Sequence, residues 1–312
     1  MSMAWQQHFS TWGQGFTVAI GAVMMVAVGS GANATLESAS SADPSLEIVA
    51  VSATGTGMVN DRPNGAIAQA APSPTLCPPD LSATLNTIVS QPRFATAQWG
   101  IVVEPLTDTS PLYSHNAETL MIPASNIKLL TTAAALRIVG SRSPQDLNQL
   151  RQWIDPVNRN SDNRAADALL RRIGGQHAVR QALLPLGIDP EGYQQVDGSG
   201  LSRQNRMRPA TLVTLLKAMA AHEDTGLFYA SLPVGGVSGT LRNRFRDSPL
   251  QGRVRAKTGT LQGVRALSGY VQNGDYGEIA FSLVINQPGQ TGTVMVQTID
   301  QMVLHISQVQ RC

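Results

Sequence analysis

The chain has 312 residues, of which 42% are hydrophobic and only 14% are charged, well below the usual quarter. This length suits one large or two ordinary domains, and the low charge argues against a coiled coil or a charged disordered chain. The net charge is +2 and the basic residues are scattered, so the composition gives no support for a nucleic-acid partner.

The first 34 residues have the pattern of an export signal. The apolar run from Phe16 to Val28 suits the hydrophobic region of a signal peptide and is too short to span a bilayer. Small residues follow, and the segment 32–34 fits an A-x-A cleavage site. Residues 1–15 contain no Lys or Arg, so an uncleaved membrane anchor stays open as the alternative. We expect an exported protein of the periplasm or cell envelope, which meets the membrane only if the signal is uncleaved.

Residues 35–76 are rich in Ala, Ser, Thr, Gly and Pro and carry few charges, which predicts a flexible tether. A short stretch, Leu46 to Val51, has the character of a strand, but the neighbouring sequence offers it no partner. The folded unit is therefore expected to run from Cys77 to Cys312.

These two cysteines are the only ones in the chain. A disulfide between Cys77 and Cys312 fits an oxidising compartment and would close a loop around the whole folded unit; two unrelated thiols are the alternative. Their separation excludes a C-x-x-C redox or zinc site, and no H-E-x-x-H sequence occurs. We expect neither a metal nor an organic cofactor.

The folded unit is expected to open with a helix and two strands, continue with a helical block, and close with three strands and a helix. The first helix is predicted at Pro79 to Val89 from its apolar spacing. The predicted strands are Gln98 to Leu106, Pro111 to Ser114, Arg253 to Thr260, Val264 to Val271 and Gly277 to Ile285. A turn at 262–263 is predicted to join the third and fourth of them. The other predicted helices are Pro123 to Val139, Pro144 to Trp153, Asp162 to Ile173, Pro209 to His222 and Thr293 to Val309.

Three short patterns occur in order within this unit: S-x-x-K at 125–128, S-x-N at 161–163 and K-T-G at 257–259. The second is weak alone, since residues 114–116 also match it. The pair formed by the other two is stronger, because two of the three lysines in the chain fall within them. The set is associated with penicillin-recognising serine enzymes.

The first pattern predicts a nucleophile and its base. The helix 123–139 is apolar on nearly all faces and should be buried. Residues three apart share a helix face, so the Lys128 amine can reach the Ser125 hydroxyl. Burial and a nearby positive charge from Lys257 would lower the pKa of Lys128 until it can remove the serine proton.

The K-T-G pattern predicts substrate contacts on a strand. Lys257 and Thr258 can hold a carboxylate, and Gly259 lets an extended peptide lie against the strand edge. The backbone N–H groups of Ser125 and Thr260 are candidates for an oxyanion hole.

The S-x-N pattern predicts a proton relay and an amide contact. Ser161 would pass a proton between Lys128 and the leaving amine, and Asn163 would bind the substrate amide. The segment Asp197 to Gly200 is interpreted as a tight turn at the edge of the site. A Ser-His-Asp triad is not expected, because the histidines lack partner sequences.

The chain resembles the D-Ala-D-Ala carboxypeptidase/endopeptidase family, the low-molecular-mass class C penicillin-binding proteins, over nearly all of residues 77–312. The resemblance is carried by PASNIKLLTTAAAL, DGSGLSRQN, LPVGGVSGTLRNR and AKTGTLQGVRALSGYV. It implies an α/β (α+β) fold, that of the penicillin-recognising serine enzymes (β-lactamase/transpeptidase-like): a five-stranded antiparallel sheet flanked by helices, plus an all-helical subdomain. We expect the sheet part at about 77–122 and 232–312, and the helical part at about 123–231.

The resemblance also implies a function. The chain would be a serine-type D-Ala-D-Ala carboxypeptidase, or also an endopeptidase, that cleaves peptidoglycan stem peptides through an acyl-enzyme on Ser125 and is inhibited by β-lactams. Family members typically carry large domains between the first two motifs, whereas 36 positions separate Ser125 from Ser161 here. Two alternatives stay open: a non-catalytic scaffold that binds the cell wall, and a serine β-lactamase, although no E-x-x-L-N occurs between Ser161 and Lys257.

Overall fold

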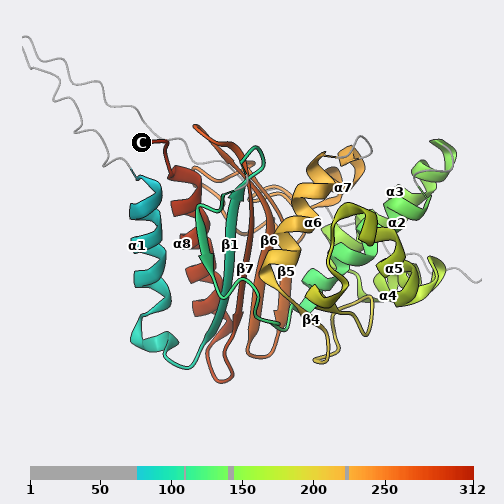
Figure 1. Ribbon diagram of the computed structural model, residues 1–312, viewed down its shortest axis with the longest axis horizontal. Coiled ribbons are helices and arrows are strands. Elements are labelled where there is room, and N and C mark those ends of the chain that lie inside the picture. The colour runs from blue at the N-terminus through green and yellow to red at the C-terminus, as the bar shows by residue number, and fades with distance from the viewer. Residues whose placement is uncertain (1–75, 109, 140–143, 222–224) are drawn as a thin grey trace, which may run out of the picture. The chain divides into compact units, whose positions relative to one another are not determined.

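The computed structural model describes residues 76–108, 110–139, 144–221 and 225–312, all within the unit Ala68–Cys312 (Figure 1). The predicted signal segment at 1–34 lies outside these ranges, as does the predicted tether at 35–76 apart from Leu76. The candidate strand at 46–51 also lies outside them, so these three expectations stay predictions.

A five-stranded antiparallel sheet with the order β2-β1-β7-β6-β5 forms the centre of the described unit. Its strands are β1 (Gln98–Pro105), β2 (Tyr113–His115), β5 (Val254–Leu261), β6 (Val264–Asn273) and β7 (Gly277–Asn286). The predicted sheet is confirmed, and each strand lies within a few residues of its predicted range. Strand β5 lies at one edge of the sheet, beside the candidate site described below.

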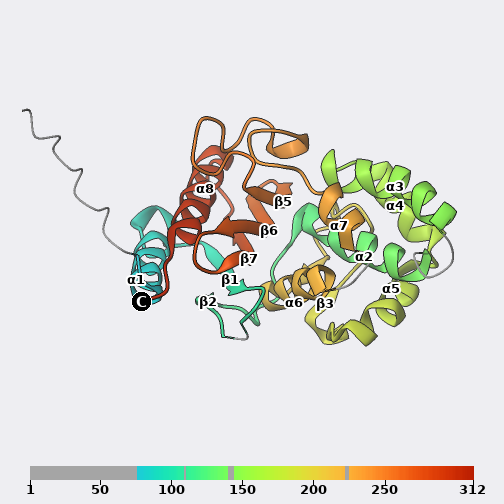
Figure 2. The same ribbon diagram turned by 90° about the horizontal axis from the view of Figure 1, so that it is seen from above.

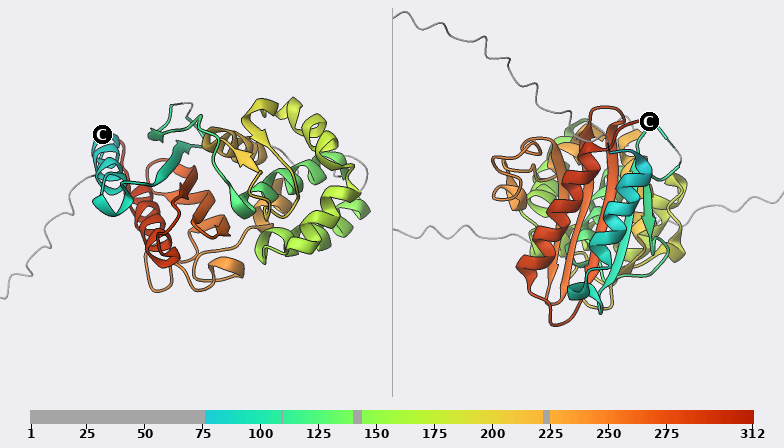
Figure 3. Two further views of the ribbon diagram at one scale, coloured as in Figure 1. Left: turned by 90° about the horizontal axis from the view of Figure 1, so that it is seen from below. Right: turned by 90° about the vertical axis from the view of Figure 1, so that its left-hand side faces the viewer.

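Two helices cover one face of the sheet, α1 (Pro78–Val89) and α8 (Gly292–Gln308), side by side in the right-hand view of Figure 3. Strand alternation explains the packing, because successive side chains point to opposite faces. Ile101 and Val103 of β1 belong to the core shared with α1 and α8, whereas Val102 belongs to the core on the other face.

The opposite face carries α6 (Pro209–Ala221), which packs on β1 and β7, and beyond it the helical part of the unit (Figure 2). At the centre of that part is α2 (Lys128–Val139), whose residues 128–136 are all buried. The expectation of a core helix is confirmed. Around α2 lie α3 (Pro144–Arg159), α4 (Asn163–Arg172), α5 (Gly175–Leu183) and α7 (Thr225–Ser231).

Four elements differ from the sequence analysis: helix α5, the end of helix α3, helix α7 and a short two-stranded ribbon. Helix α5 follows α4 directly, because Gly174 and Gly175 both adopt positive φ values, 102° and 75°, and redirect the chain. Helix α3 extends six residues beyond its predicted end, through Pro156. Helix α7 and a two-stranded ribbon of β3 (Tyr193–Gln194) and β4 (Arg206–Met207) were not predicted.

The disulfide between Cys77 and Cys312 is present, with the two Cα atoms 5.8 Å apart, so that prediction is confirmed. It closes a loop with a sequence separation of 235 residues. Leu76 also forms a parallel bridge with Val309, so the two ends of the folded unit are held together twice.

Removing this disulfide is expected to lower the free energy of unfolding by about 2–5 kcal/mol, because a long closed loop restricts the unfolded chain. Urea unfolding of a Cys77→Ser/Cys312→Ser variant measures the change. Reductant should lower the stability of the wild type to that of the variant and leave the variant unaffected. Equal stability of oxidised wild type and variant would contradict this account.

Candidate active site

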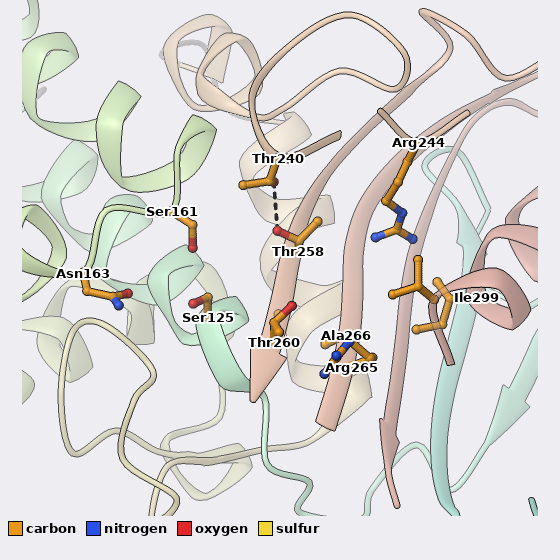
Figure 4. Close-up of a pocket in the computed structure, with 12 residues that line it drawn as sticks. Ser125, Ser161, Asn163, Thr240, Arg244, Thr258, Thr260, Arg265, Ala266 and Ile299 are labelled. Atoms are coloured by element: carbon orange, nitrogen blue, oxygen red, sulfur yellow. Dashed lines mark hydrogen bonds between the residues drawn. The ribbon is translucent and has the colours of Figure 1, made fainter. Parts of the chain in front are cut away.

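A pocket of about 390 Å³ opens beside the edge strand β5, between the sheet and the helical part (Figure 4). All three predicted patterns contribute to its lining. Its lining residues are Ser125, Ser161, Asn163, Thr240, Arg244, Thr258, Gly259, Thr260, Arg265, Ala266, Val296 and Ile299. Residues that are far apart in sequence thus share one space large enough for a peptide end.

The predicted helix 123–139 begins differently from expectation. A 3₁₀ turn, η2 (Ala124–Ile127), precedes α2, and Ala124 has a φ of 47°, in the left-handed region that a non-glycine residue rarely adopts. In a 3₁₀ turn, side chains three residues apart eclipse each other. This alignment brings the Lys128 Nζ atom to 3.0 Å from the Ser125 Oγ atom.

Lys128 is fully buried, and its amine contacts three oxygen atoms. It lies 3.0 Å from Ser125 Oγ and 2.8 Å from Asn163 Oδ1, and it also donates to the carbonyl oxygen of Ser199. Burial lowers the pKa of Lys128 to about 8, against the opposing charges of Asp167, Asp197 and Asp162. About one-tenth of the amine is therefore neutral at pH 7, and about half at pH 8, and this neutral form can accept a proton.

Lys257 is the second buried lysine, and it holds Ser161. Its Nζ atom donates to Ser161 Oγ at 2.9 Å and to the Thr258 carbonyl oxygen at 2.9 Å. Burial, with the charge of Lys128, holds the pKa of Lys257 well below its ordinary value. Ser161 has a φ of 59°, a costly conformation that places its hydroxyl in the pocket. Among the described contacts, Ser161 is bonded to Lys257 and not to Lys128.

Strand β5 offers an open edge to this pocket. Gly259 lies against the Pro123 carbonyl and Ala266, where a Cβ atom would collide. Ala256 bonds through its N–H group to Pro233, but along 257–261 no strand of the described residues pairs with the outer edge of β5. An extended peptide can therefore add to this edge.

The far end of the pocket contains residues that were not predicted from the sequence. Arg265 is the cross-strand partner of Thr260 and so shares its face of the sheet. Its guanidinium donates to the carbonyl oxygens of Leu261 and Val264, and no carboxylate of the described residues lies within ion-pair distance of it. Arg244, in contrast, is paired with Asp300. The predicted two-residue turn at 262–263 pairs Leu261 with Val264, and this register places Arg265 opposite Thr260.

Two further missed contributors act on Lys128. The Ser199 carbonyl lies in the segment that was interpreted only as a tight turn, and Asp167 binds the backbone of that segment. Asp167 follows Asn163 by four positions, so the two share one face of α4. This four-residue spacing is the feature of the sequence from which a role of Asp167 near Asn163 could have been predicted.

Comparison with known proteins agrees with this geometry. The model of the D-Ala-D-Ala carboxypeptidase 3 (S13) family matches residues 81–144 and 146–309. A D-alanyl-D-alanine carboxypeptidase of Actinomadura sp. (strain R39) is 38% identical over 176 residues, which are 51% of this chain and 32% of that protein. A D-alanyl-D-alanine carboxypeptidase DacB of Haemophilus influenzae is 35% identical over 140 residues, 40% of this chain and 29% of that protein. The matches thus span only about a third of these relatives.

Solved structures share the fold at low sequence identity. Penicillin binding protein 4 of Haemophilus influenzae, in complex with a β-lactam, superposes with a TM-score of 0.63 at 16% identity, over 72% of this chain and 99% of that one. The TLA-1 extended-spectrum β-lactamase superposes with a TM-score of 0.61 at 16% identity, over 73% and 97%. The fold is therefore that of the penicillin-recognising serine enzymes, as predicted.

Proposed function

Because the chain belongs to the D-Ala-D-Ala carboxypeptidase 3 (S13) family, we propose that it is a serine-type carboxypeptidase that removes the terminal D-Ala from peptidoglycan stem peptides. The observation that carries this proposal is the 3.0 Å contact between Ser125 Oγ and the buried Lys128 amine, beside an open strand edge. A base of lowered pKa in contact with a serine hydroxyl is the arrangement that nucleophilic catalysis requires.

The proposed reaction begins when neutral Lys128 accepts the Ser125 proton. The Ser125 oxygen attacks the carbonyl carbon of the penultimate D-Ala, and the backbone N–H groups of Ser125 and Thr260 stabilise the resulting oxyanion. Collapse of this intermediate breaks the C–N bond and expels D-Ala, whose amine takes a proton through Ser161, the hydroxyl held by Lys257. Water then hydrolyses the acyl-enzyme and restores Ser125.

The proposed substrate pose places the peptide along β5, with Asn163 bonded to its amide. The free carboxylate of the terminal D-Ala would then lie near Thr258, Thr260 and Arg265, which share one face of the sheet. Hydroxyl groups and a guanidinium that has no carboxylate partner among the described residues are donors that suit a carboxylate. The same donors would hold the carboxylate of a β-lactam that acylates Ser125.

The proposal includes the predicted organisation of the chain: an export signal at 1–34, a tether at 35–76 and a catalytic unit at 77–312. The intact disulfide supports an oxidising compartment. Among the described helices, none has both the length and the apolar character needed to cross a bilayer.

The test uses the purified full-length chain and an N-acetylated peptide that ends in D-Ala-D-Ala. We expect release of D-Ala from this peptide, much slower release of D-alaninamide from its C-terminal amide, and one persistent adduct by intact mass with benzylpenicillin. A folded chain that neither releases D-Ala nor forms the adduct would support the scaffold alternative. Rapid turnover of penicillin without an adduct would support the β-lactamase alternative.

The rate of acylation is expected to rise with pH and level off above about pH 8. The pKa of Lys128 is lowered to about 8, so below that pH most of the amine is protonated and cannot act as base. Each pH unit further down removes about nine-tenths of the neutral form. Stopped-flow acylation by a fluorescent penicillin between pH 6 and 10 measures the profile. A flat profile over this range would show that Lys128 is not the titrating base.

A further inference from the structure

The Lys128 amine has two neighbours that can only accept hydrogen bonds, the Asn163 side-chain oxygen and the Ser199 carbonyl. A neutral amine has two N–H bonds and one lone pair. In the structure the amine donates to Ser125 Oγ, and the Ser125 hydroxyl donates to the Ser199 carbonyl at 3.3 Å. When the neutral amine donates both of its N–H groups to Asn163 and Ser199, its lone pair is left for the Ser125 hydroxyl, which then turns from the Ser199 carbonyl to Lys128. The two acceptors therefore determine the direction in which Lys128 can take a proton.

The Ser199 carbonyl is held by a segment, 197–200, wedged between α4 and η2. Gly198 lies so close to α4 that a Cβ atom would overlap the Ala166 carbonyl oxygen, and at Gly200 a Cβ atom would overlap that of Ala124. Gly200 also has a φ of 84°. Both contact points thus require glycine, and small shifts of the segment would move the Ser199 carbonyl relative to Lys128.

One carboxylate oxygen anchors this segment to α4. Asp167 Oδ1 accepts hydrogen bonds from the backbone N–H groups of Gly198 and Ser199, each at 2.9 Å. These two N–H groups belong to the two peptide units immediately before the Ser199 carbonyl. The other acceptor of Lys128, Asn163, lies one turn earlier on the same face of α4.

We propose that Asp167 is a positioning residue, which holds the Ser199 carbonyl against Lys128 so that the lone pair of the amine points at Ser125. This inference rests on the proposed function, because it assigns Lys128 the role of base. Through Asn163 and Asp167, one face of α4 controls both acceptors of the base.

The charges around Lys128 allow positioning to be separated from electrostatics. Three carboxylates raise the pKa of Lys128, those of Asp167, Asp197 and Asp162, and Lys257 is the second cation nearby. Asp167→Asn keeps the Oδ1 acceptor and removes only the charge. Asp167→Ala removes both. Asp162→Asn removes a charge of the same sign from a residue that has no hydrogen bond to the segment 197–200.

The experiment measures acylation by a fluorescent penicillin against pH for four full-length proteins: wild type, Asp167→Asn, Asp167→Ala and Asp162→Asn. Both Asn variants should show a profile midpoint below that of wild type, with the high-pH plateau retained. Asp167→Ala should show a plateau lowered roughly 10- to 100-fold, the usual cost of a misplaced catalytic group. Circular dichroism and the penicillin-titrated fraction of active protein confirm that each variant is folded.

The outcomes distinguish this inference from the proposed function. A folded Asp167→Ala protein with the plateau of wild type would overturn the positioning role. A plateau lost equally in Asp167→Asn and Asp167→Ala would also overturn it, because the retained acceptor oxygen should restore the geometry. Failure of the wild type itself to acylate would instead contradict the proposed function.

Discussion

Replacing Ser125 by alanine is expected to abolish the penicillin adduct and to lower the release of D-Ala by roughly a million-fold. Ser125 is the hydroxyl in contact with the Lys128 amine, whereas the Ser161 hydroxyl is bonded to Lys257. Removal of a nucleophile leaves only what binding and the oxyanion contacts supply, and losses of this size are known for serine hydrolases. Intact mass after benzylpenicillin and a D-Ala release assay measure the two effects.

The matched control is Ser114→Ala. Ser114 belongs to the second S-x-N match in the chain, but it lies exposed on β2, outside the pocket. This variant should acylate and release D-Ala like the wild type. The Ser125 variant should also unfold at the wild-type temperature, because it loses one partly exposed oxygen atom. An adduct on the folded Ser125 variant would contradict the assignment of Ser125 as the nucleophile.

The sequence was sufficient for the parts of the site that rest on local periodicity. The apolar pattern of 123–139 predicted a buried helix, and the strand pattern around the turn at 262–263 predicted the β5–β6 hairpin. These features depend on residues close in the chain, whose spacing determines which face each side chain takes. The S-x-x-K spacing was enough to predict a contact that the structure shows at 3.0 Å.

The sequence was not sufficient where distant segments force the local conformation. The 3₁₀ turn η2 starts with Ala124 in the left-handed region, a conformation that alanine does not prefer and that tertiary packing imposes. Gly259 of β5 and Gly200 both lie against this turn. The role of the Ser199 carbonyl was missed for a similar reason, since any residue type supplies a backbone carbonyl and only the fold shows where it lies.

The pairing of the two lysines shows the same limit. The sequence analysis expected burial and the charge of Lys257 together to lower the pKa of Lys128. Burial is confirmed as the main cause, but the charge acts in the other direction, since the charge of Lys128 lowers the pKa of Lys257. Ser161 is correspondingly bonded to Lys257 rather than to the proposed base. Activation and leaving-group protonation would thus be divided between two lysines, each holding its own serine.

This division makes Lys128→Met the second variant with a large expected effect. Methionine fills a similar volume without an amine, so the buried site should stay packed while the base is lost. Acylation by penicillin is expected to fall at least about a thousandfold, within the range that general base catalysis supplies. The residual rate should also lose its rise towards pH 8, because the group that titrates there is gone. Stopped-flow acylation over pH 6 to 10 measures both effects.

Lys217→Met is the matched control, since Lys217 is the one lysine of the chain outside the motifs. It lies on α6 in an ion pair with Glu104, at 2.9 Å, and loss of such a partly exposed pair costs at most about 1 kcal/mol. Its acylation rate and pH profile should match those of the wild type. If Lys128→Met retained the same profile, Lys128 would not be the base, and the base would have to be sought at Lys257, the other buried amine with a lowered pKa.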